Sequence, residues 1–220
     1  MSDRLKEALS RLVQSGSFAK WYNNLGPAHK DPAADKEYQD ASALLSPLTS
    51  SKIQALVRIS KAEGEKNLVW TPTGDAEKYL ASVRSAVGMP VPQRFPWCGA
   101  FVYWCCKQAG FKFSASFPTG FTAAYVPGWE AWARNKKAWY SSRLTAKEFN
   151  AEPGDIVIFD WDSDSVADHI GIVLSYDGKR TLITAEGNTA ALNDSNGNAT
   201  AIRTRDWLSC KGFIRLTEND

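Results

Sequence analysis

Between residues 151 and 189 the chain alternates turn signals with apolar runs, and this alternation restricts the segment to a small antiparallel sheet. The sequence AEPGD at 151–155 is typical of a turn, and IVIF at 156–159 is typical of a buried strand. A second strand is predicted at 170–175 and a third at 181–185, joined by an Asp-Gly-Lys turn. The three strands are therefore predicted to form an antiparallel meander.

A cysteine stands upstream of this sheet, where a loop turns into an apolar helix. Pro96 suits the start of a helix, and Gly110 ends the pattern. Between them, five residues recur at helical spacing: Phe101, Trp104, Cys105, Gln108 and Ala109. Cys98 falls in the first turn, where unpaired N–H groups stabilise negative charge, and the thiolate is the nucleophilic form of cysteine. The position of Cys98 therefore indicates a catalytic thiol.

A cysteine nucleophile needs a base that is held rigidly and whose second nitrogen is fixed by a third group. The chain has two histidines, and His29 lies in a polar stretch that is predicted to be a loop. His169 begins the second strand and is the candidate base, although a lone histidine in a strand is more often structural. The third strand runs into Glu186-Gly187-Asn188, so a carboxylate and an amide end beside the histidine strand. Either side chain could orient the imidazole.

Four motifs, in this order, resemble the CHAP family, the cysteine- and histidine-dependent amidohydrolases and peptidases that cut bacterial peptidoglycan. They are Pro96-Trp97-Cys98-Gly99-Ala100-Phe101-Val102, Pro153-Gly154-Asp155-Ile156-Val157, Asp168-His169-Ile170-Gly171-Ile172-Val173 and Glu186-Gly187-Asn188-Thr189. The resemblance covers the chain from about Glu63 to the C-terminus.

The resemblance implies an α+β, papain-like fold, in which helices carrying the nucleophile pack on an antiparallel sheet carrying His and Glu/Asn. It implies that Cys98 is the nucleophile, that His169 is the general base, and that Glu186 orients the histidine. Asn188 is then a fourth, supporting polar residue. Gly99 replaces the alanine expected after the cysteine, which leaves the chemistry intact. The resemblance also implies that the reaction is acyl transfer through a thioester and that it requires no cofactor.

Three further residues are candidates for substrate binding. Gln93 lies five residues before the cysteine and could donate to an oxyanion, although a polar residue in a Pro-rich loop is more often simply solvated. Trp97 and Trp161 flank the catalytic segments and could stack on sugar or peptide, although core packing is the default for tryptophan. Cys105 and Cys106 are predicted to be small buried hydrophobes, and a pairing of either with Cys210 is left open.

The acidic run from residue 160 to 168 offers a weak calcium site. Its aspartates stand at loop positions one, three, five and nine, as in loops built on alternating oxygen ligands: Asp160, Asp162, Asp164 and Asp168. The match is incomplete, because Ser165 replaces the glycine of such loops and Gly171 stands where a bidentate carboxylate would close the site. A solvated acidic hairpin is the favoured interpretation, so no metal is predicted and calcium is left open.

Composition limits the partners and the location. A net charge of +2 over 220 residues is too weak to indicate nucleic acid. The first residues lack the apolar core of a secretory signal, and no apolar run approaches the ~20 residues of a membrane helix. We expect a helical N-terminal extension over residues 1–50 and a CHAP-like catalytic domain over 51–220. Within the latter, helices are also predicted at residues 51–62, 75–86 and 128–139. The protein is expected to be made in the cytoplasm and to act in the periplasm or cell wall.

The sequence leaves several functions open. An N-acetylmuramoyl-L-alanine amidase and an endopeptidase of stem or cross-bridge peptides need the same catalytic atoms. A wall hydrolase without a signal peptide is either an injected antibacterial effector, whose partner would be an immunity protein, or a phage lysin released at lysis. The alternatives from other classes are a catalytically silent wall-binding or phage tail module and, less favoured, an acyltransferase of transglutaminase type.

Overall fold

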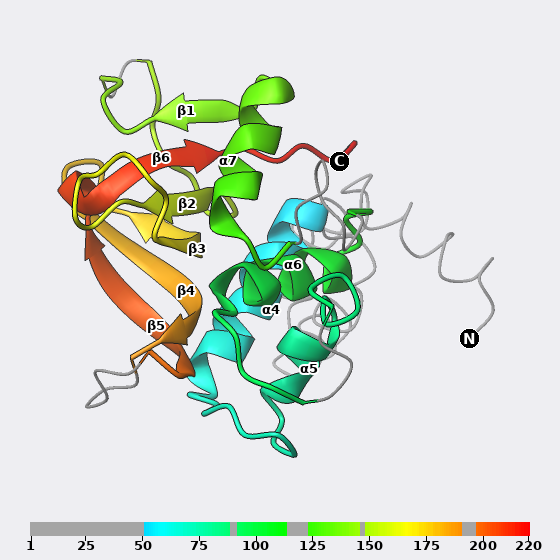
Figure 1. The fold of residues 1–220 in the computed structure, drawn as a ribbon. Helices are drawn as coiled ribbons and strands as arrows, with labels where there is room; N and C mark the ends of the chain where they lie inside the picture. The colour runs from blue at the N-terminus through cyan, green and yellow to red at the C-terminus, as the bar shows by residue number, and fades with distance from the viewer. Residues whose placement is uncertain (1–50, 89–91, 114–122, 146–147, 191–196) are drawn as a thin grey trace, which may run out of the picture. The chain divides into compact units, whose positions relative to one another are not determined.

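The computed structural model describes residues 51–88, 92–113, 123–145, 148–190 and 197–220. From Lys52 to Asp220 the chain forms one compact unit, drawn in Figure 1. The predicted N-terminal extension and the loop around His29 lie outside the described residues.

A six-stranded sheet forms one layer of this unit, and every strand pairs antiparallel with its neighbours in the order β1-β6-β2-β3-β4-β5. The strands are β1 (Trp139–Ser141), β2 (Ile156–Phe159), β3 (His169–Tyr176), β4 (Thr181–Thr189), β5 (Ala199–Asp206) and β6 (Cys210–Ile214). The predicted meander is confirmed as β2-β3-β4 at the centre of the sheet. The third strand is longer than predicted, because its pairing with β5 continues through Glu186 to Thr189.

The described helices are α4 (Lys52–Glu65), α5 (Glu77–Ala81), α6 (Cys98–Gln108) and α7 (Val126–Asn135). The predicted helices at residues 51–62 and at the cysteine are present as α4 and α6. In Figure 1, α4 and α6 lie side by side against β3, β4 and β5, with α5 beyond them. This arrangement confirms the predicted α+β, papain-like fold.

Strand β2 shows how both faces of the sheet are covered. Its four residues are all buried, and alternate side chains point to opposite faces of a strand. Ile156 and Ile158 join the main core beneath the helices. Val157 and Phe159 join a second cluster on the other face, around Phe213. The uninterrupted apolar run in the sequence is therefore the result of a strand covered on two sides.

Two helices end earlier than the sequence pattern predicts. The predicted helix at 75–86 is α5 only to Ala81, because the next residues make tighter i→i−3 bonds, such as Val83 N to Leu80 O at 3.1 Å. The predicted helix at 128–139 ends at Asn135. There Lys137 adopts a positive φ of 58°, and Ala138 N donates back to Ala133 O at 2.8 Å. Trp139 consequently starts β1 and is not helical. None of the helices in the described part of the chain is long and apolar enough to cross a membrane.

Candidate active site

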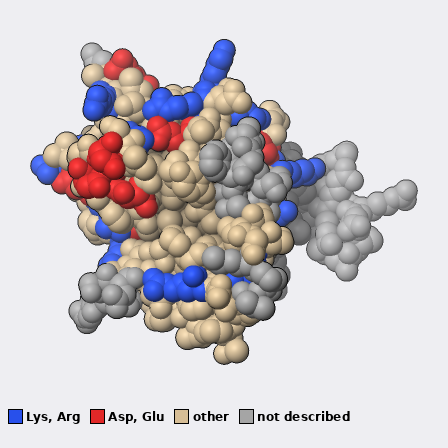
Figure 2. Space-filling view, viewed as in Figure 1, with Lys and Arg blue, Asp and Glu red and all other residues tan. Residues whose placement is uncertain are grey.

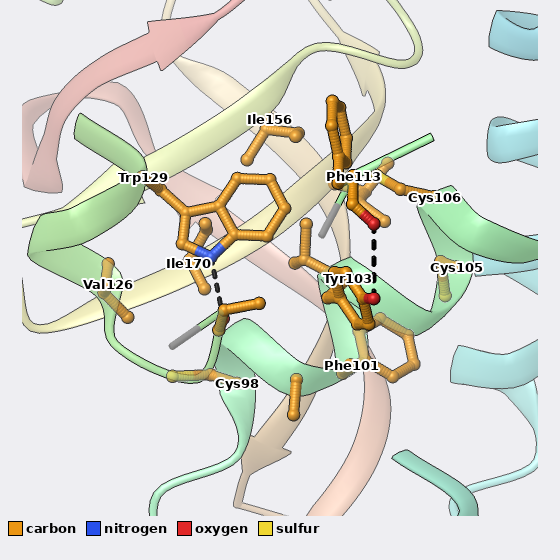
Figure 3. Close-up of a cluster of buried hydrophobic side chains, with 14 of the residues drawn as sticks. Cys98, Phe101, Tyr103, Cys105, Cys106, Phe113, Val126, Trp129, Ile156 and Ile170 are labelled. Atoms are coloured by element: carbon orange, nitrogen blue, oxygen red, sulfur yellow. Dashed lines mark hydrogen bonds between the residues drawn. The ribbon is translucent and has the colours of Figure 1, made fainter. Parts of the chain in front are cut away.

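Cys98 is the first residue of α6, and its side chain is only 3% exposed. As the first helical residue, Cys98 has no carbonyl one turn earlier in the helix to accept its N–H. The next bond of the turn is made by Phe101 N, which donates to Trp97 O at 2.9 Å. In Figure 3, Cys98 lies at the beginning of the helix. The helix therefore places the thiol and an available backbone N–H at the same point.

His169 opens β3 and Glu186 lies near the end of β4, so the antiparallel pairing brings both to one end of the sheet. The Nε2 atom of His169 is 3.0 Å from Oε2 of Glu186, and both side chains are buried. Because Nε2 faces the carboxylate, Nδ1 is left to face the thiol of Cys98, which makes a hydrogen bond with His169. The imidazole thus has a partner at each nitrogen.

The protonation of His169 is set by these neighbours. Burial lowers the pKa of His169, but the charge of Glu186 and the hydrogen bond and charge of Cys98 outweigh it and raise the pKa to about 9. Burial opposes the ionisation of Glu186, yet the hydrogen bonds of Arg205 and the charge of His169 hold its pKa well below the usual range. An imidazolium between a carboxylate and a sulfur is the arrangement that activates a cysteine nucleophile.

The carboxylate of Glu186 is fixed on all sides and is fully buried. Its Oε1 accepts from Thr184 Oγ1 at 2.6 Å and from Arg205 Nε at 2.8 Å. Its Oε2 accepts from Arg205 Nη2 at 2.5 Å, in addition to facing the imidazole. Together these contacts fix the orientation of the carboxylate, which an isolated ion pair would not do.

Glycines allow the site's elements to approach one another. A Cβ on Gly187 would lie 2.4 Å from Cβ of Phe101 on α6, and a Cβ on Gly171 would lie 2.9 Å from Cγ of Glu186. Gly99, where an alanine is expected from the family resemblance, packs against backbone: a Cβ there would lie 2.4 Å from the Ala123 carbonyl oxygen. That carbonyl also accepts from the indole N–H of Trp129 at 2.8 Å (Figure 3). The absence of a side chain at Gly99 therefore lets the start of α6 pack closely against the backbone at Ala123.

A cavity of about 290 Å³ opens over these groups, and Cys98 and His169 both line it. The described residues that line it also include Pro96, Trp161, Asp168, Asn188, Thr189, Ala190, Gly197, Arg203 and Arg205. A second hollow of about 240 Å³ is lined by Arg94, Phe95, Pro96 and Asn188, so the two share Pro96 and Asn188. The reacting groups thus lie at the wall of a groove with several arginines.

The predicted substrate-binding residues fall in different places. Trp161 is 51% exposed, lines the cavity at Cys98, and stacks on the His169 ring with centroids 5.0 Å apart. Trp97 is fully buried and stacks on Tyr79 at 5.6 Å, so it packs the core beneath α6 and cannot contact a substrate. Gln93 is exposed but does not line the cavity with Cys98. Of the three, Trp161 alone faces the groove.

Asn188 has an unusual backbone. It adopts a positive φ of 51°, at the point where the β4–β5 register shifts between Glu186 and Thr189. Nη2 of Arg94 lies 3.5 Å from its Oδ1 and donates to Gly197 O at 2.9 Å. A bulge re-aims side chains at a strand end. Here the bulge directs Asn188 into the groove, while Glu186 stays beneath His169.

The β2–β3 loop gathers the acidic residues that the sequence singled out, and Figure 2 shows them as a red patch over that loop. Oxygen atoms of Asp160, Asp162 and Asp168 lie within 4.8 Å of one another, whereas Asp164 does not belong to this group. Several of these carboxylates already accept backbone N–H groups, as Asp168 does from Trp161 N at 2.6 Å. The three carboxylates are chemically suited to calcium, and their hydrogen bonds also account for the loop's conformation.

All four cysteines are free thiols. Cys105 and Cys106 are fully buried in α6, as predicted, and Cys210 is 6% exposed. The pairing of Cys210 with either helix cysteine, left open by the sequence, is absent among these thiols. Burial raises the pKa of Cys210 to about 12 and raises that of Cys106 well above its usual range. Cys98 is the cysteine that lines the cavity.

Comparison with known families agrees with this geometry. The model of the CHAP domain matches residues 90–188, the segment that holds Cys98, His169 and Glu186. Residues 90–188 are therefore similar to the CHAP domain, whose family comprises cysteine- and histidine-dependent amidohydrolases and peptidases. No curated protein matches the chain.

Sequence reasoning missed the arginines of the site. Arg203 and Arg205 lie on β5, beyond the matched segment, in a strand that the sequence analysis did not predict. Their alternation in the run Ala199–Asp206 was the available signal, since residues two apart on a strand share a face. Nothing local in the sequence shows that this face adjoins Glu186.

Proposed function

We propose that this protein hydrolyses an amide bond of bacterial peptidoglycan, with Cys98 as nucleophile, His169 as base and Glu186 as the group that orients the base. The observation that carries the proposal is the placement of His169: its Nε2 lies 3.0 Å from Glu186, and the same ring lines a cavity with Cys98. Acyl transfer by cysteine requires a base that is oriented by a third group and faces the thiol, here at the first residue of a helix.

The proposed hydrolysis proceeds in two steps, acylation of Cys98 and hydrolysis of the thioester. The Cys98 sulfur attacks the amide carbon while the Cys98 backbone N–H donates to the developing oxyanion. The C–N bond then breaks, the imidazolium of His169 gives its proton to the leaving amine, and a thioester remains on the sulfur. Water next attacks the thioester as His169 takes its proton, and the sulfur leaves as the carboxylic acid product forms. Glu186 keeps the imidazole in one orientation throughout.

The substrate class is supported by the charge of the groove. Arg203 lines the cavity at Cys98, and no salt bridge joins it to a carboxylate of the described residues. Arg94 lines the neighbouring hollow beside Asn188. Stem peptides of the wall carry free carboxylates close to their amide bonds, and a guanidinium is suited to bind them. Trp161, half exposed next to His169, offers an apolar face for a sugar or a peptide.

The setting is inferred from the proposed substrate. We infer action in the periplasm or cell wall, as an injected antibacterial effector or a phage lysin. An effector requires an immunity protein in the producing cell, so a neighbouring gene for an exported inhibitor supports that assignment. Neighbouring holin or tail genes support a lysin instead.

The proposal is tested with intact peptidoglycan and purified protein under reducing conditions, with products identified by mass spectrometry. The wild type is compared with Cys98→Ala and with Cys210→Ser, a matched change at a cysteine outside the cavity. We expect products from the wild type and from Cys210→Ser, and none from Cys98→Ala. Free stem peptides identify an amidase, and shortened or uncrosslinked muropeptides identify an endopeptidase.

Other outcomes separate the alternatives. Equal release by Cys98→Ala contradicts the mechanism. Tight binding of peptidoglycan by the wild type without release supports a silent wall-binding module, and incorporation of an added amine supports an acyltransferase. A parallel incubation with a chelator tests the acidic loop, because calcium-dependent hydrolysis would stop whereas hydrolysis without a cofactor would continue.

A further inference from the structure

Arg205 makes the strongest polar contacts with Glu186. It lies on β5, and its Nε and Nη2 atoms reach one oxygen each of the carboxylate, at 2.8 and 2.5 Å. Its side chain is 22% exposed, whereas that of Glu186 is fully buried. Such a two-point contact between guanidinium and carboxylate fixes orientation as well as charge. Arg205 therefore orients the Glu186 carboxylate, which in turn orients the base His169.

The same guanidinium also supports the imidazole through a second contact. It lies over the Trp161 ring at 5.3 Å from the centroid, and the Trp161 ring stacks on His169 with an interplanar angle of 23°. A cation over an indole face is attractive in such geometry. Trp161 comes from a loop and is 51% exposed, so this contact adds to the stacking on His169 and Phe159 that holds the ring.

The charges around Glu186 come from several elements. His169 faces it from β3 and Arg205 from β5, while Cys98 on α6 adjoins His169 and Cys210 on β6 lies close enough to interact. Arg205 is the permanent cation of this set, because a guanidinium stays protonated. A buried carboxylate without a cation would take up a proton at higher pH. Arg205 thus keeps Glu186 ionised when His169 is neutral as well as when it is charged.

We propose that Arg205 is a positioning residue for the base, which it orients along two routes, through the Glu186 carboxylate and through the Trp161 ring. The inference rests on the proposed function for its meaning in catalysis. It adds a residue outside the matched segment, residues 90–188, to the constellation of Cys98, His169 and Glu186.

The first test compares Arg205→Met with Arg205→Lys. Methionine keeps much of the length and removes the charge, and we expect kcat/KM to fall about 100-fold, the scale of a misplaced catalytic group, with KM unchanged. Lysine restores the charge without the two-point contact, so we expect it to recover part of the loss. Arg180→Met serves as the control, because Arg180 pairs with Asp206 at the surface. Thermal unfolding of each variant shows whether it is folded.

The pH profile separates positioning from support of the fold. In Arg205→Met the pKa of Glu186 should rise, because burial is no longer opposed by the guanidinium. The acid limb of the pH profile should then move to higher pH. The rate at about pH 5, divided by the rate at about pH 8, should therefore be lower for Arg205→Met than for the wild type. A purely structural role lowers the rate by the same factor at every pH.

A double-mutant cycle supplies the decisive comparison. If Arg205 acts through Glu186, Arg205→Met should cost much less in a Glu186→Gln background than in the wild type. Additive losses, or a folded Arg205→Met with the wild-type profile, would overturn the inference.

The alkylation of Cys98 by iodoacetamide gives the same comparison without peptidoglycan. We expect Arg205→Met to slow it more at about pH 5 than at about pH 8, because the imidazole is then less well held beside the sulfur. An unchanged alkylation profile contradicts the role of Arg205 whatever the substrate is. A wild type that is alkylated rapidly but cleaves no peptidoglycan contradicts the proposed function only.

Discussion

Gly187 of β4 lies directly against Phe101 of α6: a Cβ on the glycine would come within 2.4 Å of the Phe101 Cβ. The neighbouring Ala185 also belongs to the core beneath the helices, whereas Thr184 and Glu186 point to the opposite face, as alternation on a strand requires. One glycine therefore sets how closely the nucleophile helix approaches the strand that carries Glu186.

Gly187→Ala tests this contact. The added methyl must displace both Phe101 and Trp97, whose Cζ3 would lie 2.7 Å away, so we expect a loss of about 1–3 kcal/mol in the free energy of unfolding. Urea unfolding measures it, and kcat/KM should fall with it because α6 shifts away from β4. Thr204→Ala, at an exposed position on β5, should change both only slightly. A fully stable and active Gly187→Ala would show that the two elements can separate without consequence.

Selective alkylation tests which thiol is reactive. Cys98 lines a cavity, whereas Cys105 and Cys106 are fully buried and burial raises the pKa of the Cys106 thiol. We expect native protein to take up one equivalent of iodoacetamide, located at Cys98 by peptide mapping, with loss of activity in parallel. Labelling of another cysteine that tracks inactivation would mean that the nucleophile has been assigned to the wrong sulfur.

The alkaline limit of activity follows from His169. Its pKa is raised to about 9, so the imidazolium persists through neutral pH and is lost as the pH rises through that value. We expect kcat/KM to decline near pH 9, and to decline at lower pH in Glu186→Gln, because the carboxylate charge no longer favours the imidazolium. The free energy of unfolding depends on pH in the same direction. The Glu186–His169 interaction stabilises the fold fully below the ordinary histidine pKa, and this contribution is lost as the pH rises through about 9. An alkaline limit that Glu186→Gln leaves in place would contradict this coupling.

Arg203 tests the proposed recognition of a carboxylate. Arg203→Gln should raise KM for a muropeptide with free carboxylates by about tenfold, the scale of one charged hydrogen bond, and leave kcat nearly unchanged. The matched substrate is the same muropeptide with its carboxylates amidated, for which wild type and variant should differ little. Equal KM changes with both substrates would assign Arg203 to the fold of the groove and not to recognition.

The central strands and the nucleophile helix were predictable because their signals are local. The turn-strand pattern at residues 151–185 predicted β2, β3 and most of β4, and the proline and spacing around Cys98 predicted α6. The same patterns, with the family resemblance, pointed to Cys98, His169, Glu186 and Asn188. Their types and order along the chain sufficed, since the catalytic chemistry depends on those residue types.

The rest was decided only by the tertiary structure, because it depends on residues that are distant in sequence. Trp97 and Trp161 look alike in the sequence, yet one is fully buried and the other is half exposed over His169. The contact between Arg205 and Glu186 arises from the pairing of β5 with β4, and no pattern within either segment encodes it. Sequence determined which groups can react, and strand pairing and helix packing determined which charges surround them, because long-range packing sets burial and the orientation of side chains.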